Sequence, residues 1–169
     1  MRHLLPAMFA LLVSASATWA AAADIDSLER QLAQARDEAP MVVKPFMAVA
    51  KPAQYFGDYE PRANTVYNRR ETLHFYGEPK NLLYPKNAKG QFEPAFDVDV
   101  EIRGPTGETI KQPKMMSFRL PARSRVQDIY LNLELTLDTA PPGKYNVKFV
   151  VRDLNSKKSA SVASDVTLK

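Results

Sequence analysis

From Met41 to the C-terminus, hydrophobic and polar residues alternate with a period of two. The longest alternating row runs from Ile129 to Leu137, and shorter rows occupy residues 96–102, 145–151 and 160–168. Successive side chains of a β-strand point to opposite faces, so each row predicts a strand with one buried face. Seven or so short strands, separated by Pro, Gly, Asn and Asp rather than by helices, predict an all-β fold. We expect an antiparallel two-layer sandwich over residues 41–169.

Four further stretches are predicted to form strands. Met41–Ala50 contains Pro45, which favours an edge position because proline cannot donate a hydrogen bond to a neighbouring strand. Thr72–Glu78 places Leu73, Phe75 and Gly77 on one face and Thr72, His74 and Tyr76 on the other. Thr109–Lys111 is predicted to return as a short strand after a turn at residues 104–107, and Met116, Phe118 and Leu120 alternate further on.

Residues 24–40 have a different period. Ile25, Leu28, Leu32 and Ala35 recur at spacings of three and four, which predicts a short helix that Asp24 or Asp26 caps and Pro40 ends. The apolar stripe is shorter than the three or four heptads that indicate a coiled coil. The helix is therefore expected to lie on the sandwich or to project as a spacer, with helix pairing as the alternative.

Residues 1–23 have the features of a signal peptide. Arg2 and His3 give a positive start, Leu4–Val13 is apolar, and small residues follow. Cleavage is expected after one of three alanines: Ala20, Ala22 or Ala23. The alternative is an uncleaved anchor, since residues 4–23 are about long enough to cross a bilayer. After cleavage we expect a periplasmic or secreted protein without stable membrane insertion.

Composition excludes several kinds of chemistry. The 169 residues include no Cys and only two His, so disulfides, thiol nucleophiles and Cys-ligated zinc are excluded. Neither a P-loop nor a G-x-G-x-x-G motif occurs. The net charge is +4, and removal of Arg2 with the signal peptide reduces it to +3. This charge is too small to indicate nucleic acid as the main partner, and no cofactor is expected.

Two stretches resemble known domains. Leu133–Leu137 followed by Ala140–Val147 resembles the E strand, the connecting corner and the F strand of immunoglobulin-like and fibronectin-III-like domains. In such domains a Tyr near the start of the F strand bonds its hydroxyl to the backbone of the corner, and Tyr145 matches that place. The Cys-Trp-Cys signature of antibody domains is missing, so the resemblance is to the wider sandwich class.

A longer pattern is similar to uncharacterised secreted proteins of bacteria. It comprises residues 59–64, 76–79, 96–100 and 142–145 within residues 55–169. The resemblance implies export and a β-sandwich, and it transfers no catalytic residue.

The candidate recognition surface lies in residues 51–70, which have little periodicity. Long loops that contain aromatic residues are often functional, and rings beside arginines suit a sugar or a peptide. The candidate residues are Tyr55, Phe56, Tyr59, Arg62, Tyr67, Arg69 and Arg70. The alternative is structural: Tyr55, Phe56 and Tyr67 would cap an open end of the sandwich while the arginines stay solvated.

Asp97, Asp99 and Glu101 form an acidic row on one strand face. Alternate residues on a strand are about 7 Å apart, too far to ligate one calcium ion without further residues. In an immunoglobulin-like sandwich this strand would instead lie beside one that carries basic residues, so we expect opposed charges across that pair. The basic residues are Lys144, Lys148 and Arg152.

The remaining candidates have structural explanations. His74 is expected on the polar face of a strand, because no nucleophile-elbow motif accompanies it. The methionines 41, 47, 115 and 116 lack M-x-x-M spacing and are expected to fill the core rather than bind copper. The scattered basic cluster is expected to be a solvated face: Lys111, Lys114, Arg119, Arg123 and Arg125.

These observations favour a non-enzymatic binding module of the cell envelope. Its expected partner is an envelope protein or a glycan, recruited through residues 51–70 or an exposed sheet edge by strand addition. Two alternatives stay open at this point: a carbohydrate or small-ligand module that uses residues 51–70, and a hydrolase or metal-dependent enzyme.

Overall fold

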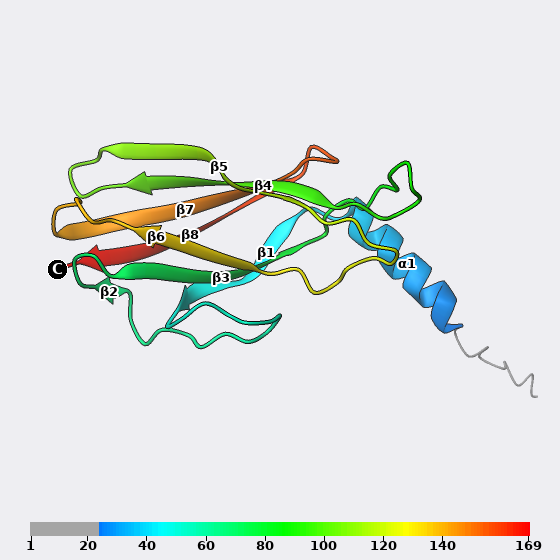
Figure 1. Cartoon of the computed structure of the whole chain (residues 1–169), viewed down its shortest axis with the longest axis horizontal. Helices are drawn as coiled ribbons and strands as arrows, with labels where there is room; N and C mark the ends of the chain where they lie inside the picture. Colours follow the sequence, from blue (N-terminus) through cyan, green and yellow to red (C-terminus); the bar gives the residue numbers. More distant parts are fainter. Residues whose placement is uncertain (1–23) are drawn as a thin grey trace, which may run out of the picture.

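The computed structural model describes residues 24–169, and the predicted signal peptide of residues 1–23 lies outside this range. The described chain forms one helix and eight strands, arranged in two sheets (Figure 1). Their bounds are α1 (Ile25–Glu38), β1 (Val42–Val49), β2 (Val66–Tyr67), β3 (Thr72–Lys80), β4 (Ala95–Arg103), β5 (Thr109–Arg119), β6 (Leu131–Thr136), β7 (Gly143–Asp153) and β8 (Ser159–Leu168).

The fold is an all-β sandwich, as predicted. One sheet has the strand order β1-β3-β6 and the other β2-β8-β7-β4-β5. The predicted alternation is confirmed along β7, where Tyr145, Val147, Phe149 and Val151 are all buried. Pro45 lies in β1 at the edge of the smaller sheet, also as predicted.

Three predictions about strands were wrong in detail. Thr109–Lys111 is not a separate strand but the beginning of β5, which continues across a bulge near Lys114 to Arg119. The sandwich is not wholly antiparallel, since the short β2 runs parallel to β8 and covers its edge. Tyr76, assigned to the polar face of β3, is fully buried because a loop covers that face as well.

The helix α1 projects from one end of the sandwich, opposite the end that holds the C-terminus (Figure 1). Within the described chain, hydrogen bonds hold only the last turn of α1 to the sandwich. Arg125 donates two hydrogen bonds to Asp37, at 2.9 and 2.6 Å, and Lys158 Nζ donates to the Asp37 carbonyl at 2.5 Å. A cation at a helix C-terminus is favourable because unpaired carbonyls gather there. Asp24 occupies the N-cap but makes no capping bond through its side chain, contrary to expectation.

The apolar stripe of α1 stays exposed. Ile25, Leu28 and Leu32 are 66%, 46% and 50% accessible, so the helix is a spacer rather than a cover for the core. Within residues 24–169, no helix is long and apolar enough to cross a membrane.

Candidate functional site

The seven residues predicted as a recognition surface do not lie together. Phe56 lines a cavity near α1 with Arg36 and Tyr84, whereas Tyr67 belongs to β2 at the other end of the sandwich (Figure 1). Tyr55 is 65% exposed and Tyr67 is 1% exposed. A single binding surface over residues 51–70 is therefore not formed.

Residues 51–61 instead cover the outer face of the smaller sheet. The ring of Tyr59 packs 4.6 Å from that of Tyr76, and the Tyr76 hydroxyl accepts a hydrogen bond from the Gly57 N–H at 2.8 Å. Asn132 of β6 exchanges two hydrogen bonds with the Ala53 backbone, at 3.0 and 2.8 Å. Burial raises the pKa of Tyr76 to about 12, so its hydroxyl stays protonated and donates to Glu78. This loop is a structural cover of a sheet face, not a cap on an open end.

The arginines of the loop differ in their surroundings. Arg62 is not solvated as the alternative interpretation expected: it lies 4.2 Å over the ring of Tyr67 and 2.7 Å from Glu71. Arg69 and Arg70 are exposed in the turn that follows β2. Tyr67 enters the main core from β2, whereas Tyr55 is exposed and contributes nothing to that core.

The acidic row on β4 pairs with basic residues, as predicted. β4 lies beside β7, and Asp99 accepts two hydrogen bonds from the Arg152 guanidinium. Lys148 stands opposite Glu101, while Lys144 lies beyond the acidic row. On the other side, β5 contributes Lys111, whose Nζ is 3.2 Å from Glu101.

The Asp99 carboxylate is expected to make stability depend on pH. Burial alone would raise its pKa, but hydrogen bonds from Arg152 and from the Lys114 backbone N–H outweigh burial and lower it. The pKa is thus lower in the folded than in the unfolded chain. The carboxylate therefore stabilises the fold at pH values above about 3.9, the pKa of Asp in the unfolded chain. This stabilisation is lost as the pH falls through the lower pKa of the folded chain.

Asp99→Asn should therefore lower the free energy of unfolding by about 1 kcal/mol at neutral pH. The variant should also lose less stability than the wild type on acidification below about pH 4, measured by urea unfolding across a pH series. Asp138→Asn, at an exposed carboxylate without an ion pair among the described residues, is the control. Parallel pH profiles for Asp99→Asn and the wild type would contradict the assignment.

The other predicted candidates occupy structural positions. His74 lies on β3, with Nδ1 4.0 Å from Glu134. Met41 is buried, and Met115 and Met116 pack against the main core. Most of the basic cluster is solvated, as predicted: the side chains of Lys111, Lys114 and Arg119 are 69%, 72% and 65% exposed, although each lies within 4.0 Å of a carboxylate. Arg125 differs, because it is 23% exposed and pairs with Asp37. Among residues 24–169, no three His, Asp or Glu side chains converge as metal ligands.

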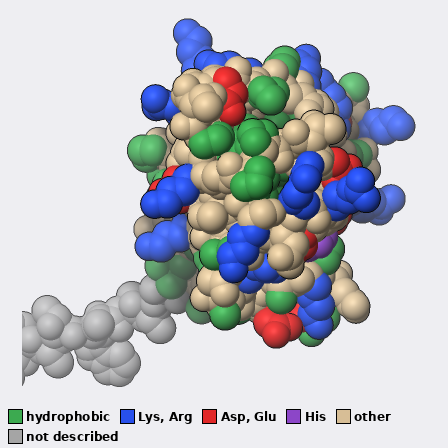
Figure 2. All heavy atoms as spheres, turned by 90° about the vertical axis from the view of Figure 1, so that its left-hand side faces the viewer, with side chains coloured by type: hydrophobic (Ala, Val, Ile, Leu, Met, Phe, Trp, Pro, Cys, Tyr) green, Lys and Arg blue, Asp and Glu red, His purple; other side chains and the backbone are tan. Residues whose placement is uncertain are grey.

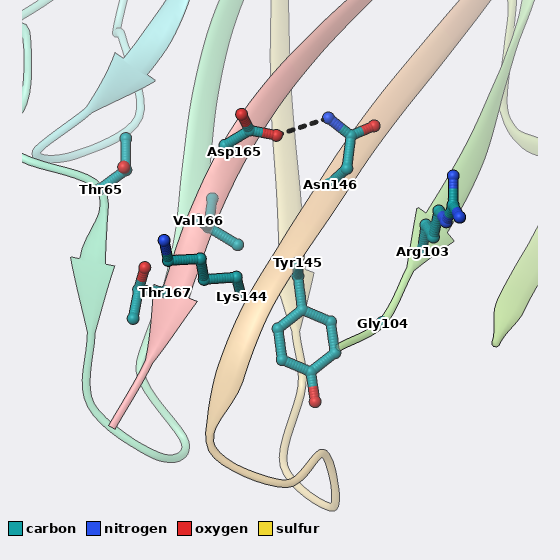
Figure 3. Close-up of a pocket in the computed structure, with 9 residues that line it drawn as sticks. All are labelled: Thr65, Arg103, Gly104, Lys144, Tyr145, Asn146, Asp165, Val166 and Thr167. Carbon is teal, nitrogen blue, oxygen red and sulfur yellow. Dashed lines mark hydrogen bonds between the residues drawn. The ribbon is translucent and has the colours of Figure 1, made fainter. Parts of the chain in front are cut away.

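A polar pocket of about 370 Å³ lies on the larger sheet near the C-terminus (Figure 3). Lys144, Asn146, Asp165 and Thr167 line it from β7 and β8. Asn146 donates to Asp165 at 2.6 Å, and Tyr145 turns away to donate to the Pro141 carbonyl at 2.6 Å. Because Lys144, Asn146 and Asp165 are solvent-exposed, the pocket is a shallow part of the sheet surface.

A second hollow lies between the edges of the two sheets. It consists of two cavities that share no lining residue: one of about 440 Å³ between the start of β5 and the end of β6, and one of about 460 Å³ between the end of β5 and the segment that precedes β6. Apolar side chains dominate the lining, among them Ile110, Phe118, Leu120, Leu135 and Leu137. Ile110 is 64% exposed although it stands opposite the buried Ile102 of β4.

The strand order explains this hollow. Across the core, β1 contacts β8, and Phe75 of β3 lies 5.4 Å from Phe149 of β7. Leu135 of β6 shares a cavity with Val100 and Ile102 of β4. The smaller sheet therefore ends opposite β4, and no described strand faces β5. The inward side chains of β5 are left partly uncovered.

The two edges beside the hollow differ. β5 contains Pro113, which has no backbone N–H, and a bulge near Lys114, and both features discourage pairing with a further strand. The edge of β6 has no proline and no bulge, and within the described chain only β3 pairs with it. The open edge next to the apolar hollow is therefore that of β6.

Figure 2 shows the end of the molecule that holds the C-terminus. Hydrophobic side chains gather near the middle of this end, and lysines and arginines lie around its margin. The β4–β5 turn and the β6–β7 connection, both near the hollow, are at this end of the molecule (Figure 1).

Comparison with known proteins adds little to this geometry. No protein-family model and no curated protein sequence matches the chain. Among solved structures, the sporulation control protein Spo0M from Bacillus subtilis is similar at 11% sequence identity, with a TM-score of 0.34. The alignment covers 78% of this chain and 50% of that protein, so the chain spans half of its length.

Proposed function

We propose that the mature chain is an exported, non-catalytic binding module of the cell envelope that recruits a protein partner by strand addition. An extended segment of the partner would pair with the open edge of β6 and lie over the uncovered face of β5. Main-chain hydrogen bonds would supply affinity and the apolar hollow would accept alternate side chains. The observation that carries this proposal is that the apolar side chains of Ile110 and Phe118, on the inward row of β5, face no strand of residues 24–169. The composition of residues 1–23 supports export.

The same proposal includes an immunoglobulin-like classification of the sandwich. The hydrogen bond from Tyr145 to the Pro141 carbonyl supports this classification, because such domains have a similar contact at the corner before the F strand. With β1, β3 and β6 as A, B and E, and β4, β7 and β8 as C, F and G, the order of these six strands agrees with that class, and β2 and β5 are additional edge strands. In immunoglobulin constant domains a D strand pairs with E. That position is unfilled among the described residues, and it is where the partner segment would bind.

Site-specific photocrosslinking tests the proposed function. A photoreactive amino acid at Gln112, which lines the hollow, should form an adduct with a second protein in envelope fractions. The same group at Ser161, exposed on β8, should not. Ile110→Lys should abolish the adduct at position 112, because a charge would enter the apolar hollow. Val42→Lys, at a 41% exposed apolar residue on the opposite side, is the matched control and should leave the adduct unchanged. Equal adducts from positions 112 and 161, or persistence in Ile110→Lys, would refute strand addition.

A further inference from the structure

The charges around the hollow are mainly acidic, although the whole chain is basic. The charged residues that line its two cavities are Glu108, Arg119, Asp128 and Asp138. The single base, Arg119, already lies 3.5 Å from Glu93. Asp128 precedes β6 and Asp138 follows it, and both are exposed without an ion pair among the described residues. The two ends of the open edge therefore carry negative charge.

A further carboxylate stands in the middle of the edge. Glu134 lies on the outer face of β6, with its side chain 51% exposed. Its one ion-pair contact within the described chain is His74, at 4.0 Å. A strand added to β6 would place its outward side chains beside Glu134, since residues opposite each other on paired strands share a face.

We propose, on the basis of the proposed function, that the partner segment alternates apolar and basic residues over about the six-residue length of β6. Its inward positions would be aliphatic or aromatic, to pack against Ile110, Phe118 and Leu135. Its outward positions would carry Lys or Arg, facing the carboxylates of Asp128, Glu134 and Asp138. This is the chemistry of an amphipathic basic strand.

A second copy of the chain fits less well. Pairing of two β6 edges would bring the same three carboxylates of each copy together, and like charges across paired strands are destabilising. Pairing through β5 would meet Pro113 and the bulge near Lys114. The charges along β6 and the irregular backbone of β5 thus favour a basic segment of another protein over a second copy of this chain.

Two synthetic eight-residue peptides test this chemistry on the mature chain. Both have valine at alternate positions, with lysine between the valines in one and glutamate in the other. Binding is followed by the backbone amide shifts of ¹⁵N-labelled protein in NMR titrations. The lysine peptide should shift the amides of Leu131–Thr136 and bind roughly five- to tenfold more tightly than the glutamate peptide at low salt. Half-molar salt should reduce the difference, because it screens exposed charges.

Two matched variants test whether the preference for the lysine peptide depends on a carboxylate of β6 or on the net charge of the protein. Glu134→Lys should abolish most of the preference for the lysine peptide. Asp165→Lys makes the same charge change at an exposed residue of β8 in the other sheet and should preserve the preference. Thermal melts of both variants check that the fold is intact.

Each outcome of the titrations is decisive. If both peptides shift the amide signals of β6 and bind with equal affinity, strand addition is supported and the proposal of a basic partner segment is refuted. If Glu134→Lys and Asp165→Lys weaken the preference equally, the local role of Glu134 is refuted. If neither peptide shifts β6, both the basic partner and the proposed strand addition are overturned.

Discussion

Phe149→Ala is expected to lower the free energy of unfolding by about 4 kcal/mol, because it leaves a cavity in the centre of the core. Phe149 is fully buried on β7, and its ring lies 5.4 Å from that of Phe75 and 6.0 Å from that of Phe46. These two rings belong to the opposite sheet, so the substitution removes contacts that hold the two layers together.

Urea unfolding of the protein measures this effect, and Val150→Ala is the matched control. Val150 is the next residue of β7 and is only half-buried, so its truncation should cost under about 1 kcal/mol. A loss of less than about 1 kcal/mol in Phe149→Ala would contradict the assignment of this ring to the centre of the core.

Asp153→Ala is expected to cost about 3 kcal/mol, because it leaves several donors without an acceptor. The Asp153 side chain is buried and accepts hydrogen bonds from the Leu83 and Asn155 N–H groups, both at 2.9 Å, and from Ser156 Oγ at 2.8 Å. One carboxylate thus joins the β7–β8 turn to the chain that follows β3.

Asp153→Asn tests the hydrogen-bonding explanation. It retains one acceptor oxygen and should have an intermediate stability in urea unfolding. Ser156→Ala, which removes one of the three donors, should cost about 1 kcal/mol. Equal stability of Asp153→Ala and the wild type would show that these bonds contribute nothing to folding.

Much of the fold could be predicted from local patterns. The rows at Phe96–Ile102 and at Tyr145–Val151 identified β4 and β7, because burial of one strand face needs only alternate apolar residues. The resemblance to an immunoglobulin-like sandwich predicted that these two strands lie side by side with opposed charges, and Asp99 meets Arg152 accordingly.

Contacts between distant segments could not be predicted in this way. The cover over β3 depends on Tyr59 meeting Tyr76, and the turn at Asp153 depends on Leu83. Tyr76 lies on the face of β3 that was predicted to be polar. Asp153 continues the buried row of β7, but a carboxylate does not by itself predict burial. The aromatic content of residues 51–70 indicated a special role, but a recognition surface and a structural cover use the same residue types.

The sequence by itself determined where the strands lie and which face of each is apolar, because neighbouring side chains on a strand must point in opposite directions. Only the tertiary structure decided which edges stay open. Whether β5 is covered depends on how many strands the facing sheet contains, and the row that includes Ile110 and Phe118 has the same pattern in either case. The number of strands in that sheet is set by pairing between distant segments of the chain. The candidate site at β6 therefore could not be identified before the two sheets were seen together.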